Sequence, residues 1–379
     1  MGIRLDGTTD TISAPGSDLN LGQSGDSVKL ASEVQLPTAG ALSSRRININ
    51  GAMQVAQRGT ITNAGNEYGG PDRYRFAKND GAYTISQDTD APSGSGFVSS
   101  FKIDVTSAAS STGNQYVILQ HKMEGQDLQQ FKKGTSSAES FTLQFWIKST
   151  KTGTYVVELT HTDNTRHVCK TYTVSSSNTW EYKTITFPAD TSGVLANNNA
   201  SSLQLNWWLY AGSTYNSGTL PTSWAAFADA NSAVGQVNAA DSTSNNIFFT
   251  GIQLEVGEKA TPFEHRSFGD ELAKCMRYFQ KSYSYSDAPG SATSTGTAWM
   301  TIAQGGGRIV HTAYLKERMR ATPTFKTYDW AGTIDKIRTS SGNNQGASSI
   351  YSSENAVIVD VNVSGVTENI FQYTVEAEL

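Results

Sequence analysis

Apolar and polar residues alternate in short runs through the middle of the chain, from about Tyr68 to Phe263. The runs are rich in β-branched and aromatic residues, and clusters of turn-forming residues separate them. Because the side chains of a strand point alternately to its two faces, this pattern predicts the strands of an antiparallel sandwich. The eight best candidates cover residues 96–105, 116–121, 141–148, 154–160, 168–174, 180–187, 203–210 and 246–256. Strands in this number predict a jelly-roll β-sandwich.

One helix is predicted after the sandwich, over residues 267–281. Apolar residues recur there at helical spacing, and Ser267 with Asp270 forms the Ser-x-x-acid pattern that caps exposed backbone amides. The apolar face consists of Leu272, Cys275, Met276 and Phe279. Alternation returns in residues 298–303, 308–315, 324–328, 356–363 and 371–379. We therefore assign residues 46–266 to the sandwich, and residues 267–379 to the helix and a small C-terminal β-domain.

The beginning of the chain has a different pattern. From Leu5 to Pro37, short apolar runs of two or three residues recur between glycines. Strands this short cannot bury a core within one chain, but they can when several chains wind together. Residues 1–45 are therefore predicted to be a short-strand arm for oligomerisation or docking, with a disordered leader as the alternative. The spacing of apolar residues changes in the segment from Arg45 to Arg58, and we interpret this segment as a connector into the sandwich.

The composition excludes several classes of function. A formal net charge of −5 and a pI of about 5.6 leave no broad basic face for nucleic acid. No run of about 18 apolar residues occurs, and the first residues lack the basic-then-apolar order of a secretory signal, so membrane insertion is not expected. Aromatic residues make up 10% of the chain, which is typical of a chain that folds.

The most suggestive chemistry lies in a group of aromatic residues late in the sandwich. Flat rings stack on the apolar faces of sugars while amides meet their edges, so aromatics near Asn206 and Asn216 suit a glycan site. The candidate residues are Trp207, Trp208, Tyr210, Tyr215 and Trp224. A role in the core or in a subunit contact is the alternative. Neighbouring residues of a strand face opposite sides, so at least one of the two adjacent tryptophans is expected in the core.

No pattern indicates a catalytic site. Glycan cleavage needs two facing carboxylates, and no spacing, including that of Glu124 and Asp127, places two together. His161 and His167 could share a sheet face only on an unbroken strand, and Asp163-Asn164 between them is a turn signal. The sequence contains no nucleophile elbow, P-loop or dinucleotide fingerprint. The two cysteines, Cys169 and Cys275, are expected to be free and buried. We predict a protein that is not an enzyme.

Three stretches resemble bacteriophage tail-fibre and related virion proteins that carry a jelly roll of the carbohydrate-binding-module kind. The first is I-N-G-A-M-Q-V-A-Q-R-G from Ile49, followed by P-D-R-Y from Pro71. The second is G-I-Q-L-E-V-G-E-K-A-T-P-F-E-H-R-S from Gly251, which continues into F-G-D-E-L-A-K-C-M-R-Y-F-Q-K-S. The third is the ending Y-T-V-E-A-E-L. With the strands between them, these stretches cover nearly all of the chain after residue 45.

The resemblance implies a homotrimer at the virion surface, whose N-terminal arm docks on other virion proteins and whose β-domains meet the host surface. It also implies that a structural Ca²⁺ near a sheet edge is compatible with the fold, although the sequence does not select its ligands. No other cofactor is expected. Our hypothesis is a tail fibre or similar appendage that binds host envelope glycans. The first alternative is a head-surface fibre or capsid decoration protein with little receptor role, and the second is a glycan-cleaving tail spike.

Overall fold

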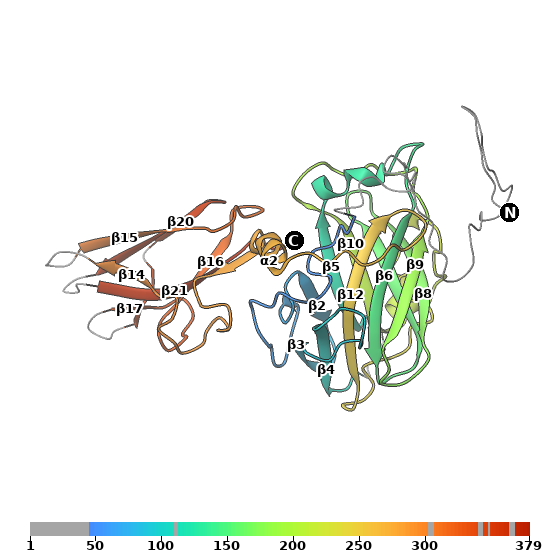
Figure 1. The fold of residues 1–379 in the computed structure, drawn as a ribbon, viewed down its shortest axis with the longest axis horizontal. Helices are drawn as coiled ribbons and strands as arrows, with labels where there is room; N and C mark the ends of the chain where they lie inside the picture. The colour runs from blue at the N-terminus through green and yellow to red at the C-terminus, as the bar shows by residue number, and fades with distance from the viewer. Residues whose placement is uncertain (1–44, 110–112, 302–306, 340–343, 348, 364–367) are drawn as a thin grey trace, which may run out of the picture. The chain divides into compact units, whose positions relative to one another are not determined.

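The computed structural model describes residues 45–109, 113–301, 307–339, 344–347, 349–363 and 368–379 (Figure 1). The expected N-terminal arm therefore lies outside the described residues, except for Arg45. The described residues form one compact unit of mainly β structure, as the sequence predicts. In the part of the chain that the structure describes, no helix is both long enough and apolar enough to cross a membrane.

The larger part of the unit is a sandwich of two antiparallel sheets, whose strands lie side by side in Figure 1. One sheet has seven strands, in the order β1 (Glu67–Tyr68), β2 (Tyr74–Lys78), β5 (Tyr116–Glu124), β10 (Ser201–Ala211), β7 (Gly153–His161), β8 (Arg166–Val174) and β11 (Ala225–Ala226). The other has five, in the order β3 (Ala82–Asp88), β4 (Ser100–Ser107), β12 (Asn246–Val256), β6 (Phe141–Ser149) and β9 (Glu181–Phe187). The predicted jelly-roll sandwich is consistent with this arrangement.

All eight strands predicted for the sandwich are present, as β4 to β10 and β12. The pattern missed β2 and β3, and also the two-residue strands β1 and β11. In β2, which reads Y-R-F-A-K, Arg75 interrupts the apolar residues and the strand has only five residues. Such a short charged run is not recognisable as a strand until its partner β5 is known. The prediction that Asp163-Asn164 forms a turn is confirmed, because the two residues join β7 to β8.

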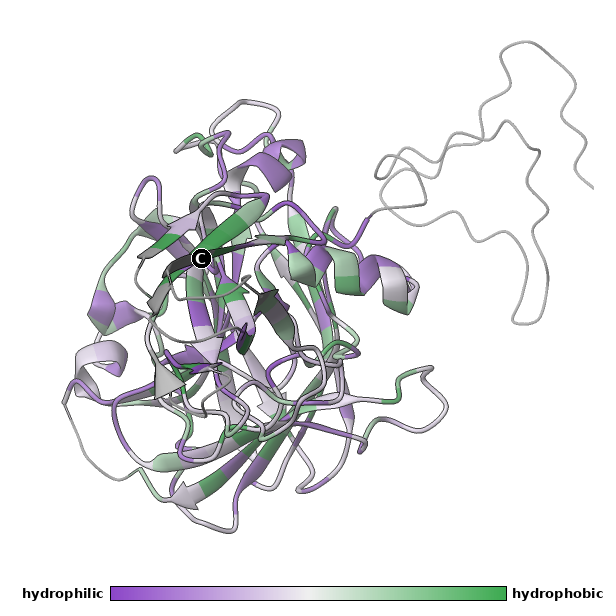
Figure 2. Cartoon of the chain, turned by 90° about the vertical axis from the view of Figure 1, so that its left-hand side faces the viewer, coloured by the Kyte–Doolittle hydropathy of each residue, from purple (hydrophilic) through white to green (hydrophobic). Residues whose placement is uncertain are grey.

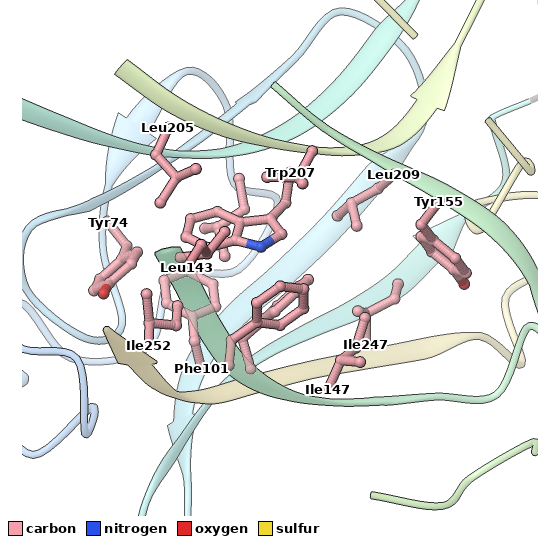
Figure 3. Packing of buried hydrophobic residues seen from close by; sticks show 14 of the residues in the cluster. Tyr74, Phe101, Leu143, Ile147, Tyr155, Leu205, Trp207, Leu209, Ile247 and Ile252 are labelled. Atoms are coloured by element: carbon pink, nitrogen blue, oxygen red, sulfur yellow. The ribbon is translucent and has the colours of Figure 1, made fainter. Parts of the chain in front are cut away.

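Alternate side chains of the two sheets meet in one core (Figure 3). Trp207 of β10 is fully buried there, with ring centroids 5.7 Å from Phe249 and 5.9 Å from Phe145 of the opposite sheet. Hydrophobic and hydrophilic segments accordingly alternate along the strands (Figure 2). Large aromatic side chains dominate this core, because each removes about 150–250 Å² of surface from water.

The connector packs along β12, so two of the stretches that carry the resemblance lie side by side. Ile47 N donates to Leu254 O at 3.0 Å, and Ile252 N donates to Gly51 O at 2.9 Å. A Cβ atom on Gly51 would lie 2.0 Å from Ile252 O, so only glycine permits this approach. Gly251 has a φ of +63° where the pairing of β12 with β6 shifts register, and it supplies the left-handed residue of that irregularity.

The predicted helix is present as α2 (Phe268–Met276), which is shorter than expected. Ser267 caps it by accepting a hydrogen bond from Asp270 N at 3.1 Å, as predicted. The helical interpretation of residues 277–281 was wrong, because Phe279–Lys281 forms the strand β13. Phe279 therefore belongs to a sheet, where it pairs with Glu376 of β21 (Glu368–Glu376).

The C-terminal β-structure has β21 at its centre, paired with β13, β14 (Ala298–Thr301), β16 (Thr324–Tyr328) and β17 (Ile337–Thr339). Strand β17 also pairs with β18 (Asn344–Gln345). A second sheet contains β15 (Gly307–Tyr314), β20 (Ala356–Val363) and β19 (Ser349–Ser352). The five C-terminal strands expected from the sequence are present, although β21 begins and ends earlier than predicted. The boundaries proposed at 45/46 and 266/267 stay predictions.

A buried ionic cluster ties the resembling stretches together; we define it as Arg46, Arg58, Asp72, Arg73, Glu271 and Glu378. Arg46 pairs with Glu271, and both side chains are nearly inaccessible to water. Arg58 Nη2 lies 3.0 Å from Glu378 Oε1, and Arg73 pairs with the other oxygen of that carboxylate. Arg58 Nη1 also lies 3.7 Å from Asp72 Oδ1. Residues more than 200 positions apart are thus joined by paired charges.

Candidate functional site

A pocket of about 280 Å³ opens on the outer face of the seven-stranded sheet, the face that does not pack on the five-stranded one. Four neighbouring strands, β2, β5, β10 and β7, provide its floor, and the segment after β10 provides a wall. Its lining consists of Arg75, Ala77, Tyr116, Ile118, Gln120, Glu158, Thr160, Gln204, Asn206, Trp208, Tyr215, Phe227, Asp229 and Ser232. The floor residues alternate with core residues along each strand, so the pleat presents them all on one face.

A row of polar side chains crosses the floor from strand to strand. The register places Arg75 beside Gln120, and Asn206 between Gln120 and Glu158. Arg75 Nη1 donates to Gln120 Oε1 at 2.6 Å, Gln120 Nε2 donates to Asn206 Oδ1 at 3.0 Å, and Asn206 Nδ2 donates to Glu158 Oε2 at 3.2 Å. Each amide is oriented by its two neighbours, so the floor is held in place without a ligand.

Glu158 is the fixed end of this row. Trp208 Nε1 donates to its Oε2 at 3.1 Å, and His167 Nδ1 lies 2.8 Å from its Oε1. Glu158 is 1% exposed and His167 is fully buried. Because the carboxylate already accepts bonds from three side chains, its role is to orient Trp208 and Asn206 rather than to react.

Aromatic rings rise on one side of the polar row. The Tyr215 ring lies 5.3 Å from that of Trp208 and 5.8 Å from that of Tyr116, centroid to centroid. Trp208 is 3% exposed, whereas Tyr116, Tyr215 and Phe227 are half-buried. Trp208 therefore lies behind the ring of Tyr215, and the half-buried rings present apolar surface to the pocket.

The wall is held by the segment that follows β10. Tyr215 lies in α1 (Ser213–Asn216), a single helical turn that packs on η3 (Asp229–Asn231). Ala233 N donates to Tyr215 O at 2.8 Å, and Gly218 N donates to Ala230 O at 2.8 Å. These bonds hold the backbone of the segment that carries Tyr215, and the ring packs on Trp208 and Tyr116.

The structure brings only part of the predicted aromatic group to this pocket. Trp208 and Tyr215 line it. The inclusion of Trp207 was wrong, because its ring lies between the two sheets, whereas the expectation that one of the adjacent tryptophans belongs to the core is confirmed. Tyr210 was also included wrongly. A register shift between Trp208 and Tyr210 pairs Tyr210 with Val117, so the bulge turns Tyr210 inward to the core.

Trp224 is half-buried, but it packs against the sandwich core outside the pocket. Its Nε1 donates to Pro188 O at 2.8 Å, and Lys133 Nζ lies 4.6 Å from its ring centroid. Both the polar atom and one face of the ring therefore have protein partners. Trp224 therefore lies outside this pocket, and its predicted glycan contact stays a prediction.

The residues that the sequence reasoning missed are the polar members of the row: Arg75, Gln120 and Glu158. Arg75 and Glu158 each stand alone between apolar residues of a strand, as in V-V-E-L-T around Glu158, whereas Gln120 lies between Leu119 and His121. A single polar residue at an outward position of an otherwise apolar run is the signal that could have found Arg75 and Glu158. The pattern cannot reveal that they share one row, since that depends on the order of the strands.

One group of side chains has the chemistry of metal ligands. Glu158, His167 and Cys169 each offer an atom within 4.8 Å of the other two. Burial raises the pKa of the Cys169 thiol, and thiolate is the form that binds metals. Cys169 Sγ lies instead 3.4 Å from Ser232 O, as a thiol donor would. Calcium prefers oxygen ligands, and only Glu158 of the three supplies oxygen, so the expected structural Ca²⁺ stays a prediction.

The other residues considered for chemistry have structural partners. Arg277 Nε and Nη2 each donate to Glu124 at 2.8 Å, and Tyr278 Oη lies 2.5 Å from the same carboxylate. Glu124 is fully buried, so it does not face Asp127 across an open site. Cys169 and Cys275 are both free and buried, as predicted.

No family model matches this chain, and no curated protein matches it. Among solved structures, the enzymatically active domain of tailspike protein 4 of bacteriophage CBA120 is 13% identical with a TM-score of 0.30, covering 52% of this chain and 21% of that one. A putative sugar-binding protein from Bacteroides thetaiotaomicron is 11% identical with a TM-score of 0.33, covering 57% of this chain and 100% of that one. The family 11 carbohydrate-binding module from Clostridium thermocellum is 10% identical with a TM-score of 0.26, covering 50% of this chain and 91% of that one. Likenesses this small carry no conclusion about function.

Proposed function

We propose that the chain is a glycan-binding protein without catalytic activity, and that its pocket on the outer face of the seven-stranded sheet is the binding site. The observation that carries this proposal is the combination of half-buried rings with an ordered row of amides. Sugars present apolar faces that stack on rings and hydroxyl groups that hydrogen-bond to amides. The floor is ordered before binding, so little entropy is lost when a ligand enters.

Binding without cleavage is favoured by the state of the pocket's carboxylates. Hydrolysis requires one acid and one base or nucleophile that face each other across the bond. Glu158 is occupied by three donors, and Asp229 is an exposed residue of η3. The Glu158 carboxylate is therefore engaged by protein partners and is not free to act on a glycosidic bond. Incubation with host polysaccharide should therefore release no reducing ends.

The wider role that we propose is that of a phage virion appendage, a tail fibre or similar structure at the virion surface. The resemblance of three stretches of sequence supports it, and so does the way these stretches pack against one another in the connector, β12 and the ionic cluster. In this role the chain is a homotrimer, and three weak sites act together through avidity. Immunogold labelling of virions would separate a tail location from a head location.

The pocket can be tested with the full chain on an array of bacterial capsular and O-antigen oligosaccharides. Tyr215→Ala should abolish binding to the array members that the unaltered protein retains, because the Tyr215 side chain lines the pocket and is only half-buried. The matched control is Tyr314→Ala, which removes a tyrosine that is 79% exposed on β15. Binding that persists in Tyr215→Ala and is lost in Tyr314→Ala would place the site in the C-terminal β-structure instead.

A further inference from the structure

We propose that the glycan is acidic, and that a carboxylate of a uronic acid residue binds Arg75 at the β2 side of the pocket. This inference rests on the proposed function and names the class of sugar. Arg75 lines the pocket and is half-buried, and it carries the one cationic group in the lining. Its surroundings leave that charge available to a ligand.

The hydrogen bonds of Arg75 leave one edge of its guanidinium group open. Nη1 donates to Gln120 Oε1, while Nε and Nη2 have no hydrogen-bond partner among the residues described. Two parallel N–H groups on one edge match the two oxygens of a carboxylate. Gln120 is itself held by Asn206, so the guanidinium plane is oriented by the same row that forms the pocket floor.

Arg75 is also without a neutralising partner. In the described part of the chain, no carboxylate lies within ion-pair distance of Arg75 or of Lys122, which follows Gln120 by two positions on the same face of β5. Burial, and then the nearby charges of Arg75 and Arg73, lower the pKa of Lys122. Two positive groups thus stand close together, and an anionic ligand would relieve their repulsion.

Two charged residues of the pocket lining come from different ends of the sheet. Arg75 is on β2, whereas Asp229 follows β11 at the other edge of the sheet. Strand β2 lies two strands from β10, which carries Trp208, a separation of about 10 Å. The distance between β2 and β10 is longer than one pyranose ring. The sugar that meets Tyr215 and the carboxylate that meets Arg75 therefore belong to neighbouring residues of an oligosaccharide.

The test uses calorimetry with the full chain and a panel of three polyuronates: polygalacturonate, alginate and hyaluronan. Each is paired with its carboxyl-reduced form, which differs only in charge and in one hydroxyl group per uronic acid. We expect carboxyl reduction to weaken binding by about tenfold to a hundredfold, the range for a charge-assisted hydrogen bond. Arg75→Met should weaken polyuronate binding and abolish the difference in affinity between each polyuronate and its carboxyl-reduced form.

Three outcomes separate the two proposals. Equal binding of polyuronate and reduced polymer would overturn the acidic ligand and leave glycan binding intact. Binding to a glycerol-phosphate teichoic acid in place of every polyuronate would also overturn it, since the anion would then be a phosphate. Absence of binding to all polymers, acidic or reduced, together with an array on which Tyr215→Ala changes nothing, would remove the glycan-binding function itself.

Discussion

Two groups of charged and polar side chains in this chain have opposite surroundings. In the buried ionic cluster, each arginine meets a carboxylate from a distant segment, and the side chains are almost inaccessible to water. In the pocket, Arg75 is half-buried and no carboxylate pairs with it within the described ranges. Paired, dry charges stabilise a packing arrangement, whereas an unpaired charge beside half-buried rings is available to a ligand.

The difference predicts that the two groups respond to mutation in opposite ways. Removing a partner from the ionic cluster leaves a buried charge without compensation. Removing a side chain from the pocket exposes groups that water can reach. Stability should therefore depend on the cluster and on the buried Trp208 behind the pocket wall, whereas binding should depend on the half-buried residues of the pocket.

The largest expected effect is that of Glu271→Gln in the ionic cluster. It leaves the buried guanidinium of Arg46 without its carboxylate, which should lower the free energy of unfolding by about 3–5 kcal/mol. Urea denaturation measures this change. The control is the double variant Arg46→Met/Glu271→Leu, which removes both charges and should recover part of the loss. A single variant as stable as the unaltered protein would mean that this pair is not structural.

Trp208→Ala should cause the next largest loss of stability, because Trp208 is 3% exposed and packs in a small cluster with Ile118 and Val156. We expect a loss of about 3 kcal/mol or more in the free energy of unfolding, together with weaker glycan binding. Tyr215→Ala should cost less, about 1 kcal/mol, because Tyr215 is only partly buried. Thermal melts of both variants compare them. Equal losses would place Tyr215 in the core and contradict the pocket wall.

A pH effect should come from His121, whose ring lies beside the ionic cluster. Its Nε2 accepts a bond from Ile49 N at 3.4 Å, and burial lowers its pKa well below the usual 6.5. The unfolded chain therefore binds more protons than the folded chain below about pH 6.5. Stability should fall as the pH drops through that range, by up to about 1.4 kcal/mol per pH unit for this group. Denaturation at pH 7 and pH 5 measures the slope, and His121→Gln should flatten it.

The smallest effect on stability should be that of Arg75→Met. The side chain has one hydrogen bond within the described residues and no ion pair there, so the free energy of unfolding should change by about 0.5 kcal/mol or less. Differential scanning calorimetry checks this. A drop of several kcal/mol would show that Arg75 is a structural residue like Arg73, and the contrast between the two groups would no longer hold.

The strands were largely predictable because alternation is a local property of the sequence. Strands β12 and β16 have the predicted ends, and the start of α2 follows from the cap at Ser267. The end of α2 was not predictable, since Phe279 has the same apolar character in a helix as in β13. What decides between them is the pairing of β13 with β21, about 95 residues later in the chain.

The site depended on features that no local pattern contains. The sequence by itself determined that aromatics and amides lie close together near the end of β10, and that adjacent tryptophans face opposite sides. Only the tertiary structure decided that a bulge turns Tyr210 into the core and that Arg75 and Glu158, from β2 and β7, end one row with Asn206 between them. Side-chain direction follows from the backbone of one strand, but a pocket follows from the order in which strands pair.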